Sequence, residues 1–289
     1  MLITDMYQSP EVGIYVPRPY VKRQFPLVRY GSKTIFELMD IFLPDTGEGP
    51  FPAVIDIHGG GYFYGSRASV RMEPVLELIH RGYVVVTLDY TLSPYGKFPL
   101  QVQEIKAAVR YLRAHAELYH INPDRIGLWG LSAGAHLAVL AAVSTGVKEL
   151  DDPDMGNAEY PDTVQAVVDL YGPVDLAIGD ADEHEDPSGT MSAMLFGKPL
   201  CQAPELLRLS NPCHFIHDRI PPVFIQHGDS DHLVDVQNSR LLYNRIVQIA
   251  GEGRGYFQIL KGADHADPLF RTEENNRIIY EFLDRYLTE

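Results

Sequence analysis

The chain is poor in cysteine, and its two cysteines, Cys201 and Cys213, belong to no metal-binding or redox spacing. Two cysteines among 289 residues give no disulfide framework, so we expect a reducing compartment, the cytoplasm, and two free thiols, with a single disulfide between them as the alternative. The sequence also lacks a cluster of His, Cys, Asp and Glu with the spacing of a metal site. We therefore expect neither a metal nor any other cofactor.

Long apolar runs and excess positive charge are absent as well. Residues 1–10 lack the basic region and apolar stretch of a signal peptide, and no apolar run approaches the ~20 residues of a membrane span. The net charge of -15 disfavours nucleic acids and anionic membranes, because the long-range interaction is repulsive. We expect a small-molecule partner, with no nucleic acid and no membrane. The oligomeric state stays open, a homodimer included.

What the sequence does contain is the pattern Gly130-Leu131-Ser132-Ala133-Gly134, between an apolar run at 126–129 and an Ala- and Leu-rich run at 136–144. The two runs predict a buried strand and a buried helix. A serine on a tight strand-to-helix turn, with a glycine two residues away on each side, forms a nucleophile elbow. We therefore predict that Ser132 is a nucleophile, with the helix N-terminus favouring a developing oxyanion.

Three consecutive glycines follow another predicted strand, at 53–57, in the segment His58-Gly59-Gly60-Gly61-Tyr62. Glycine loses more conformational freedom on folding than other residues, so three together are costly. We therefore prefer the interpretation that this backbone approaches a ligand closely to the alternative, a flexible surface turn. We predict an oxyanion hole formed by the backbone N–H groups of Gly60, Gly61 and Ala133. Tyr62 is a candidate substrate contact.

Two further predicted strands end in loops that carry an acid and a base. The strand at 222–226 leads into a loop with Asp231, and the strand at 256–260 leads into a loop with His265. Parallel strands place their carboxyl ends at one edge of a sheet, where sites form, and elbow enzymes have the chain order serine, acid, histidine. We predict Asp231 as the acid and His265 as the base.

Nearby residues offer alternatives for both roles. Asp229 and Asp235 compete with Asp231 for the role of the acid. Three other histidines are interpreted as non-catalytic: His227 as a structural residue at a strand end, His232 as a solvated loop residue, and His136 as a core residue.

With these motifs, the chain resembles the α/β-hydrolase superfamily, and within it the carboxylesterases related to hormone-sensitive lipase and the short acetyl-esterase group. Further matching segments, spread from about residue 35 to the C-terminus, are 88–94, 122–126, Pro221-Pro222 and 262–268. The resemblance implies serine-ester chemistry through Ser132, Asp231 and His265. The chain departs from the family in Leu131, where an acidic residue is common, in Ala135, where a second glycine is usual, and in a short N-terminal cap.

Alternating strand and helix patterns predict an α/β fold, the α/β-hydrolase fold, with a central mostly parallel sheet and helices on both faces. We expect one domain over residues 1–289, with an antiparallel edge near 33–43. Further strands are expected at 83–89 and 164–170, and helices at 98–119, 236–249 and 272–287.

Two segments lie outside this pattern. Residues 1–30 hold four prolines and predict an extended N-terminal arm, either a lid over the pocket or an arm packed on the sheet edge. Residues 175–215 form a loop followed by helical spacing of Met191, Met194 and Phe196. These three residues are candidates for the substrate pocket, with plain core packing as the alternative.

The preferred hypothesis is a serine carboxylesterase that hydrolyses short acyl esters, acetyl above all, of a small alcohol or sugar through an acyl-enzyme. An arylformamidase-like amidase or peptidase on the same fold is the alternative. A ligand-binding receptor on a hydrolase scaffold is disfavoured, because all three members of a triad are present.

Overall fold

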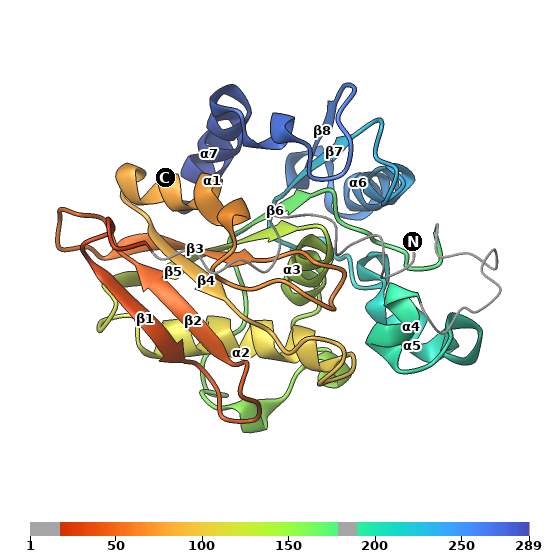
Figure 1. Ribbon diagram of the computed structural model, residues 1–289, viewed down its shortest axis with the longest axis horizontal. Coiled ribbons are helices and arrows are strands. Elements are labelled where there is room, and N and C mark those ends of the chain that lie inside the picture. Colours follow the sequence, from red (N-terminus) through yellow and green to blue (C-terminus); the bar gives the residue numbers. More distant parts are fainter. Residues whose placement is uncertain (1–17, 179–189, 289) are drawn as a thin grey trace.

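An eight-stranded sheet forms the centre of the computed structural model, which describes residues 18–178 and 190–288 (Figure 1). The strands are β1 (Gln24–Arg29), β2 (Leu38–Phe42), β3 (Phe51–Ile57), β4 (Val84–Leu88), β5 (Ile121–Leu131), β6 (Ala166–Leu170), β7 (Val223–Gly228) and β8 (Gly255–Leu260). Their order across the sheet is β1-β2-β4-β3-β5-β6-β7-β8. β2 runs antiparallel to both of its neighbours, β1 and β4, and every other neighbouring pair, from β4 to β8 across the sheet, is parallel. The expected mostly parallel sheet is therefore confirmed.

Helices cover both faces of the sheet. They are α1 (Glu73–Leu76), α2 (Leu100–Ala114), α3 (Ala133–Val143), α4 (Met191–Phe196), α5 (Pro204–Ser210), α6 (Gln237–Ala250) and α7 (Glu273–Leu287), with short 3-10 turns between them. Buried side chains of α2, α3 and α6 form one apolar cluster with the sheet, and those of α1 and α7 form another on the opposite face. Figure 1 shows α1 and α7 above the sheet, and α2 and α3 below it. None of the helices among the described residues combines the length and apolar character needed to cross a membrane.

The alternation of side chains along β3 explains how one strand serves both clusters. Ala53, Ile55 and Ile57 point to the cluster with α2 and α3, and Val54 points to the cluster with α1 and α7. Successive side chains of a strand face opposite sides of the sheet, so a doubly covered strand is apolar throughout. Asp56 breaks this rule, since it is buried in β3 on the same face as Val54.

The antiparallel end of the sheet extends further than the sequence predicted. The expected edge at 33–43 contains β2, but β1 lies outside it, within the segment interpreted as an arm. Pro26 is tolerated there because an edge strand has unpaired N–H positions. Residues 24–29 are thus packed on the sheet, as the second interpretation of the arm proposed. The rest of that interpretation, residues 1–17, lies outside the described residues.

Candidate active site

The elbow is a sharp turn between β5 and α3, and its centre is Ser132. Ser132 has φ 54° and ψ -121°, a conformation that non-glycine residues rarely adopt. A Cβ atom on Gly130 would lie 2.4 Å from the Cα of Ala135, and one on Gly134 would lie 2.0 Å from the carbonyl oxygen of Ile57. Only glycine allows this close approach of β3, β5 and α3. The predicted elbow is therefore present, and it exposes the serine hydroxyl above the sheet.

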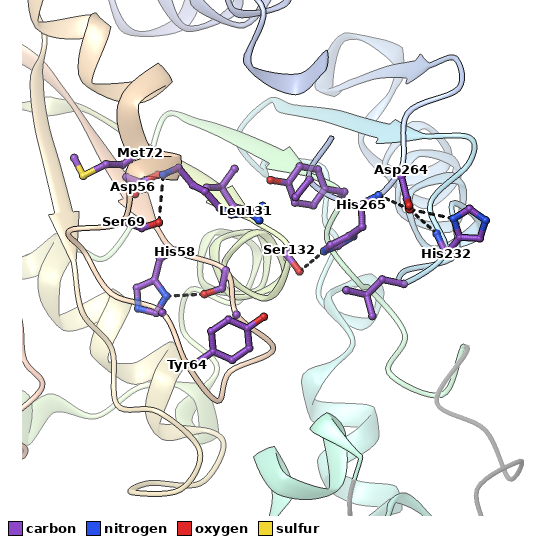
Figure 2. Close-up of a pocket in the computed structure, with 17 residues that line it drawn as sticks. Asp56, His58, Tyr64, Ser69, Met72, Leu131, Ser132, His232, Asp264 and His265 are labelled. Atoms are coloured by element: carbon purple, nitrogen blue, oxygen red, sulfur yellow. Dashed lines mark hydrogen bonds and ion pairs between the residues drawn. The ribbon is translucent and has the colours of Figure 1, made fainter. Parts of the chain in front are cut away.

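Ser132, His265 and Asp231 form a hydrogen-bonded line at the carboxyl ends of β5, β8 and β7. The Nε2 atom of His265 lies 2.9 Å from Ser132 Oγ (Figure 2). Its Nδ1 atom lies 2.8 Å from Asp231 Oδ2. Because a carboxylate only accepts, Nδ1 carries the proton, and Nε2 of the neutral ring accepts from the serine hydroxyl. Ser132 and His265, which are 133 positions apart in the chain, are thus joined by a hydrogen bond along which a proton can move.

Asp231 is held in place by four donors. Its Oδ1 accepts from the backbone N–H groups of Leu233 and Val234, both at 2.8 Å, and its Oδ2 faces His265 and His227. Burial alone would raise the pKa of this carboxyl, but the hydrogen bonds from His227 and His265 outweigh it and hold the pKa well below its usual range. The carboxylate remains charged and fixed in orientation.

His227 plays a larger part in this arrangement than a residue that closes a strand end. It is fully buried, and its Nε2 lies 2.9 Å from the Val234 carbonyl oxygen and 3.1 Å from Asp231 Oδ2. Both oxygens are acceptors, so Nε2 carries a proton and donates to them. Its Nδ1 lies 2.7 Å from Ser239 Oγ, whose hydroxyl can donate to it. His227 therefore links Asp231 to α6.

The alternative acids have other partners. Asp229 accepts from the backbone N–H of Gly262 at 2.6 Å, and Asp235 accepts from Gln237 N at the start of α6. His232 is solvated, as expected, and its Nδ1 lies 3.2 Å from Asp264. His136 is a buried core residue, as expected, between the Tyr62 hydroxyl at 2.9 Å and the Ser210 carbonyl oxygen at 2.7 Å.

Tyr171, directly after β6, is a site residue that the sequence analysis missed. Its ring meets that of His265 edge to face, with centroids 4.8 Å apart, and its backbone has φ 49°. Burial raises the pKa of its hydroxyl to about 12, so the phenol stays neutral. An aromatic residue after a strand is common. The only signal for Tyr171 in the sequence is that it follows the strand directly after the elbow and its helix.

The three N–H groups predicted for the oxyanion hole have no partner among the described residues. In the part of the chain that the structure describes, the backbone N–H groups of Gly60, Gly61 and Ala133 donate to no other residue. The carbonyl oxygen of Gly60, by contrast, accepts from Phe63 and Tyr64 at 3.0 and 3.1 Å, which fixes the turn. Gly59 and Gly60 line the same cavity as Ser132. The oxyanion role itself stays a prediction.

A cavity of about 330 Å³ opens beside Ser132 (Figure 2). Its walls come from the glycine loop and the segment after it, from the elbow, and from the loops after β6, β7 and β8: Asp56, Gly60, Tyr64, Ser69, Arg71, Met72, Leu131, Tyr171, Leu233 and His265 among others. The cavity thus lies at the carboxyl edge of the sheet, where the sequence predicted the site.

The predicted substrate contacts lie elsewhere. Tyr62 is buried with its hydroxyl against His136, and Phe196 packs against Phe98, with ring centroids 5.7 Å apart. Met191 and Met194 are half-buried in α4. Within the described residues, none of these four lines the cavity. The helical spacing is present in α4, and of the three candidates only Phe196 belongs to the buried core.

Comparison with known proteins shows which family and which relatives this chain is similar to. The BD-FAE family model matches residues 39–246, which include Ser132 and Asp231. Esterase LipC of Mycobacterium tuberculosis is 28% identical over 284 residues, which are 96% of this chain and 68% of LipC. The chain spans 53% to 68% of the lengths of the curated relatives that it matches.

Two solved structures share the fold. A truncated form of a carbohydrate esterase from gut microbiota is 28% identical, with a TM-score of 0.84, and covers 96% of this chain and 100% of its own. The acetyl ester-xyloside bifunctional hydrolase from Caldicellulosiruptor lactoaceticus is 25% identical, with a TM-score of 0.72, over 93% of this chain and 97% of its own. These matches confirm the predicted fold and the resemblance that the motifs indicated.

Proposed function

The chain belongs to the BD-FAE family and has the α/β-hydrolase fold, and on this premise we propose that it is a serine carboxylesterase. The observation that carries the proposal is the hydrogen-bonded line from Asp231 through His265 to Ser132, beside an open cavity. Relatives and solved structures that are named esterases support the same activity.

Acylation begins at the serine hydroxyl. As Ser132 Oγ attacks the ester carbonyl carbon, His265 Nε2 takes the hydroxyl proton, and Asp231 stabilises the resulting imidazolium. The carbonyl oxygen becomes an oxyanion. The N–H groups of Gly60, Gly61 and Ala133 would receive it; each such donor is typically worth on the order of 100- to 1000-fold in rate.

Collapse of this intermediate breaks the bond between the carbonyl carbon and the alcohol oxygen. His265 gives its proton to the departing alcohol, and an acyl ester of Ser132 remains. Water then attacks the acyl carbon while His265 Nε2 takes one of its protons. The acid leaves, and Ser132 regains a proton from His265.

We propose short acyl groups, acetyl above all, on a small alcohol or sugar as the substrate. The cavity of about 330 Å³ beside Ser132 has room for such an acyl group. The names of the two solved structures, a carbohydrate esterase and an acetyl ester-xyloside hydrolase, support a sugar as the alcohol.

The test is the hydrolysis of a series of p-nitrophenyl esters, from acetyl to decanoyl. We expect kcat/KM to be highest between acetyl and butyryl and to fall for longer chains. A roomy pocket would instead add about 0.8 kcal/mol for each buried methylene. A value that keeps rising beyond eight carbons would therefore contradict the short-acyl proposal. Faster hydrolysis of N-formylkynurenine than of any ester would favour the amidase alternative.

A further inference from the structure

Asp56 is a buried carboxyl group without a hydrogen-bonding partner. It lies in β3, two residues before His58, and is 2% exposed. None of the described residues donates a hydrogen bond to it, and its Oδ1 is fully enclosed. A buried polar group normally has a partner, so an unsatisfied one in a cavity wall indicates that a ligand supplies it. Asp56 lines the cavity that contains Ser132.

The positive charge that acts on the pKa of Asp56 does not satisfy its Oδ1 with a hydrogen bond. Arg18 attracts it electrostatically, but the Arg18 guanidinium donates to the carbonyl oxygen of Ser69 at 2.8 Å and pairs with Glu73 at 3.1 Å. Burial raises the pKa of Asp56 to about 7, against the opposing effect of Arg18. Both forms of the group can bind a hydroxyl, because a carboxylate accepts and a carboxylic acid also donates.

The position of Asp56 relative to the reaction decides which part of the substrate it meets. In Figure 2, Asp56, Ser69 and Met72 lie on the opposite side of Ser132 from His265. His265 must protonate the departing alcohol, so the alcohol lies on the His265 side. The part of the cavity on the Asp56 side of Ser132 is then open to the acyl group.

The walls of this inner end are mixed in character. Leu131 and Met72 offer apolar surface to a short carbon chain, while Ser69 and Arg71 add polar groups to the cavity wall. A plain hydrocarbon chain would cover Asp56 without giving it a hydrogen bond, which is unfavourable. A chain that carries a hydroxyl would satisfy the group instead.

We propose that Asp56 forms an acyl subsite that selects short acyl groups bearing a hydroxyl. This inference rests on the proposed esterase function, because it assigns the acyl side of the same cavity. Asp56 would act as a specificity-determining residue that binds substrate, with no part in proton transfer at Ser132.

The experiment compares p-nitrophenyl esters of 2-hydroxybutyrate and 3-hydroxybutyrate with that of butyrate, all with four carbons. The measured quantity is the ratio of kcat/KM for each hydroxy ester to kcat/KM for butyrate. A hydrogen bond to a charged group predicts a ratio of about ten or more for at least one hydroxy ester. In Asp56→Leu we expect the ratio to fall to about one or below, and in Asp56→Asn to be partly retained, because an amide also donates and accepts.

Thr87→Val provides the matched control. Thr87 is fully buried, pairs in register with Asp56 on β4, and also has an unsatisfied oxygen, yet it is not among the residues that line the cavity. Its substitution tests for a general disturbance of this part of the sheet and should leave the ratio unchanged.

The outcomes separate this inference from the esterase proposal. Failure to cleave any of the three esters would contradict the proposed function itself. Cleavage with wild-type ratios near one, or with ratios unchanged in Asp56→Leu, would overturn the subsite alone. If thermal melting shows that Asp56→Leu is unfolded, the wild-type ratios and Asp56→Asn still decide, because ratios near one in the wild type suffice to reject the subsite.

Discussion

Two carboxylates on opposite sides of Ser132 differ in how the protein satisfies them. Asp231 accepts hydrogen bonds from two backbone N–H groups and faces two histidines, whereas Asp56 receives none from the described residues. Their pKa values move in opposite directions, downward for Asp231 through its hydrogen bonds and upward for Asp56 through burial. The carboxylate of the proposed triad is thus held by the protein itself, whereas the proposed acyl subsite leaves its carboxyl for a ligand to satisfy.

The largest effect in this comparison should come from removing the nucleophile. We expect Ser132→Ala to lower kcat by at least ~10⁴-fold, because no other group can form the acyl-enzyme. The melting temperature should change little, since alanine fits the tight turn. Ester hydrolysis assays on the purified variant check this, and more than a few per cent of residual activity would rule out Ser132 as the nucleophile.

Replacing the satisfied carboxylate should be nearly as severe. Asp231→Asn should lower kcat by about 10⁴-fold, by analogy with the serine-protease triad, because the amide favours the wrong tautomer of His265. Asp229→Asn is the matched control, since its carboxylate contacts Gly262 and not His265. Kinetics of both variants decide between them: if Asp229→Asn is the more damaged enzyme, the acid is misassigned.

We expect an intermediate effect on kcat at His227, which contacts Asp231 and does not contact Ser132 or His265 in the described structure. His227→Leu removes a donor from the charged Asp231, so we expect kcat to fall by about 10- to 100-fold with little change in KM. His227→Gln, which can still donate, should recover part of the loss. Equal effects of Leu and Gln, or a change confined to KM, would show that His227 does not position the acid.

The smallest effect concerns stability on the unsatisfied side. Asp56 keeps its proton up to about pH 7 in the native state, while the unfolded chain releases it near 4, so native stability falls as pH rises between these values. Asp56→Asn cannot ionise and escapes this loss. Its melting temperature relative to wild type should therefore rise by a few degrees between pH 5 and pH 8. A difference that is constant with pH would contradict the raised pKa.

The sequence predicted those parts of the site whose chemistry requires a local pattern. The elbow needs Gly130 and Gly134 for steric reasons, so the five residues 130–134 suffice to predict it. The strands β4 and β6 are buried on both faces, so their apolar runs identify them directly. Asp231 and His265 were predicted from their loops after two apolar strands and from the chain order of elbow enzymes.

Other parts depend on contacts that no local pattern encodes. β1 is largely exposed and contains Pro26, so it shows no apolar alternation. The apolar face of α4 was predicted, but the sequence could not tell that Phe98, and not the substrate, would cover Phe196. Asp56 offered a signal that was overlooked: it is the one charged residue in β3.

The origin of the site residues in four adjacent parallel strands has a further consequence. Ser132, Tyr171, Asp231 and His265 follow β5, β6, β7 and β8, which pair in that order. A slip of one residue between any two of these strands would move a side chain by about 3.3 Å, more than a hydrogen bond tolerates. Esterase activity would therefore be lost in chains with a shifted strand register, even where their overall secondary-structure content is normal.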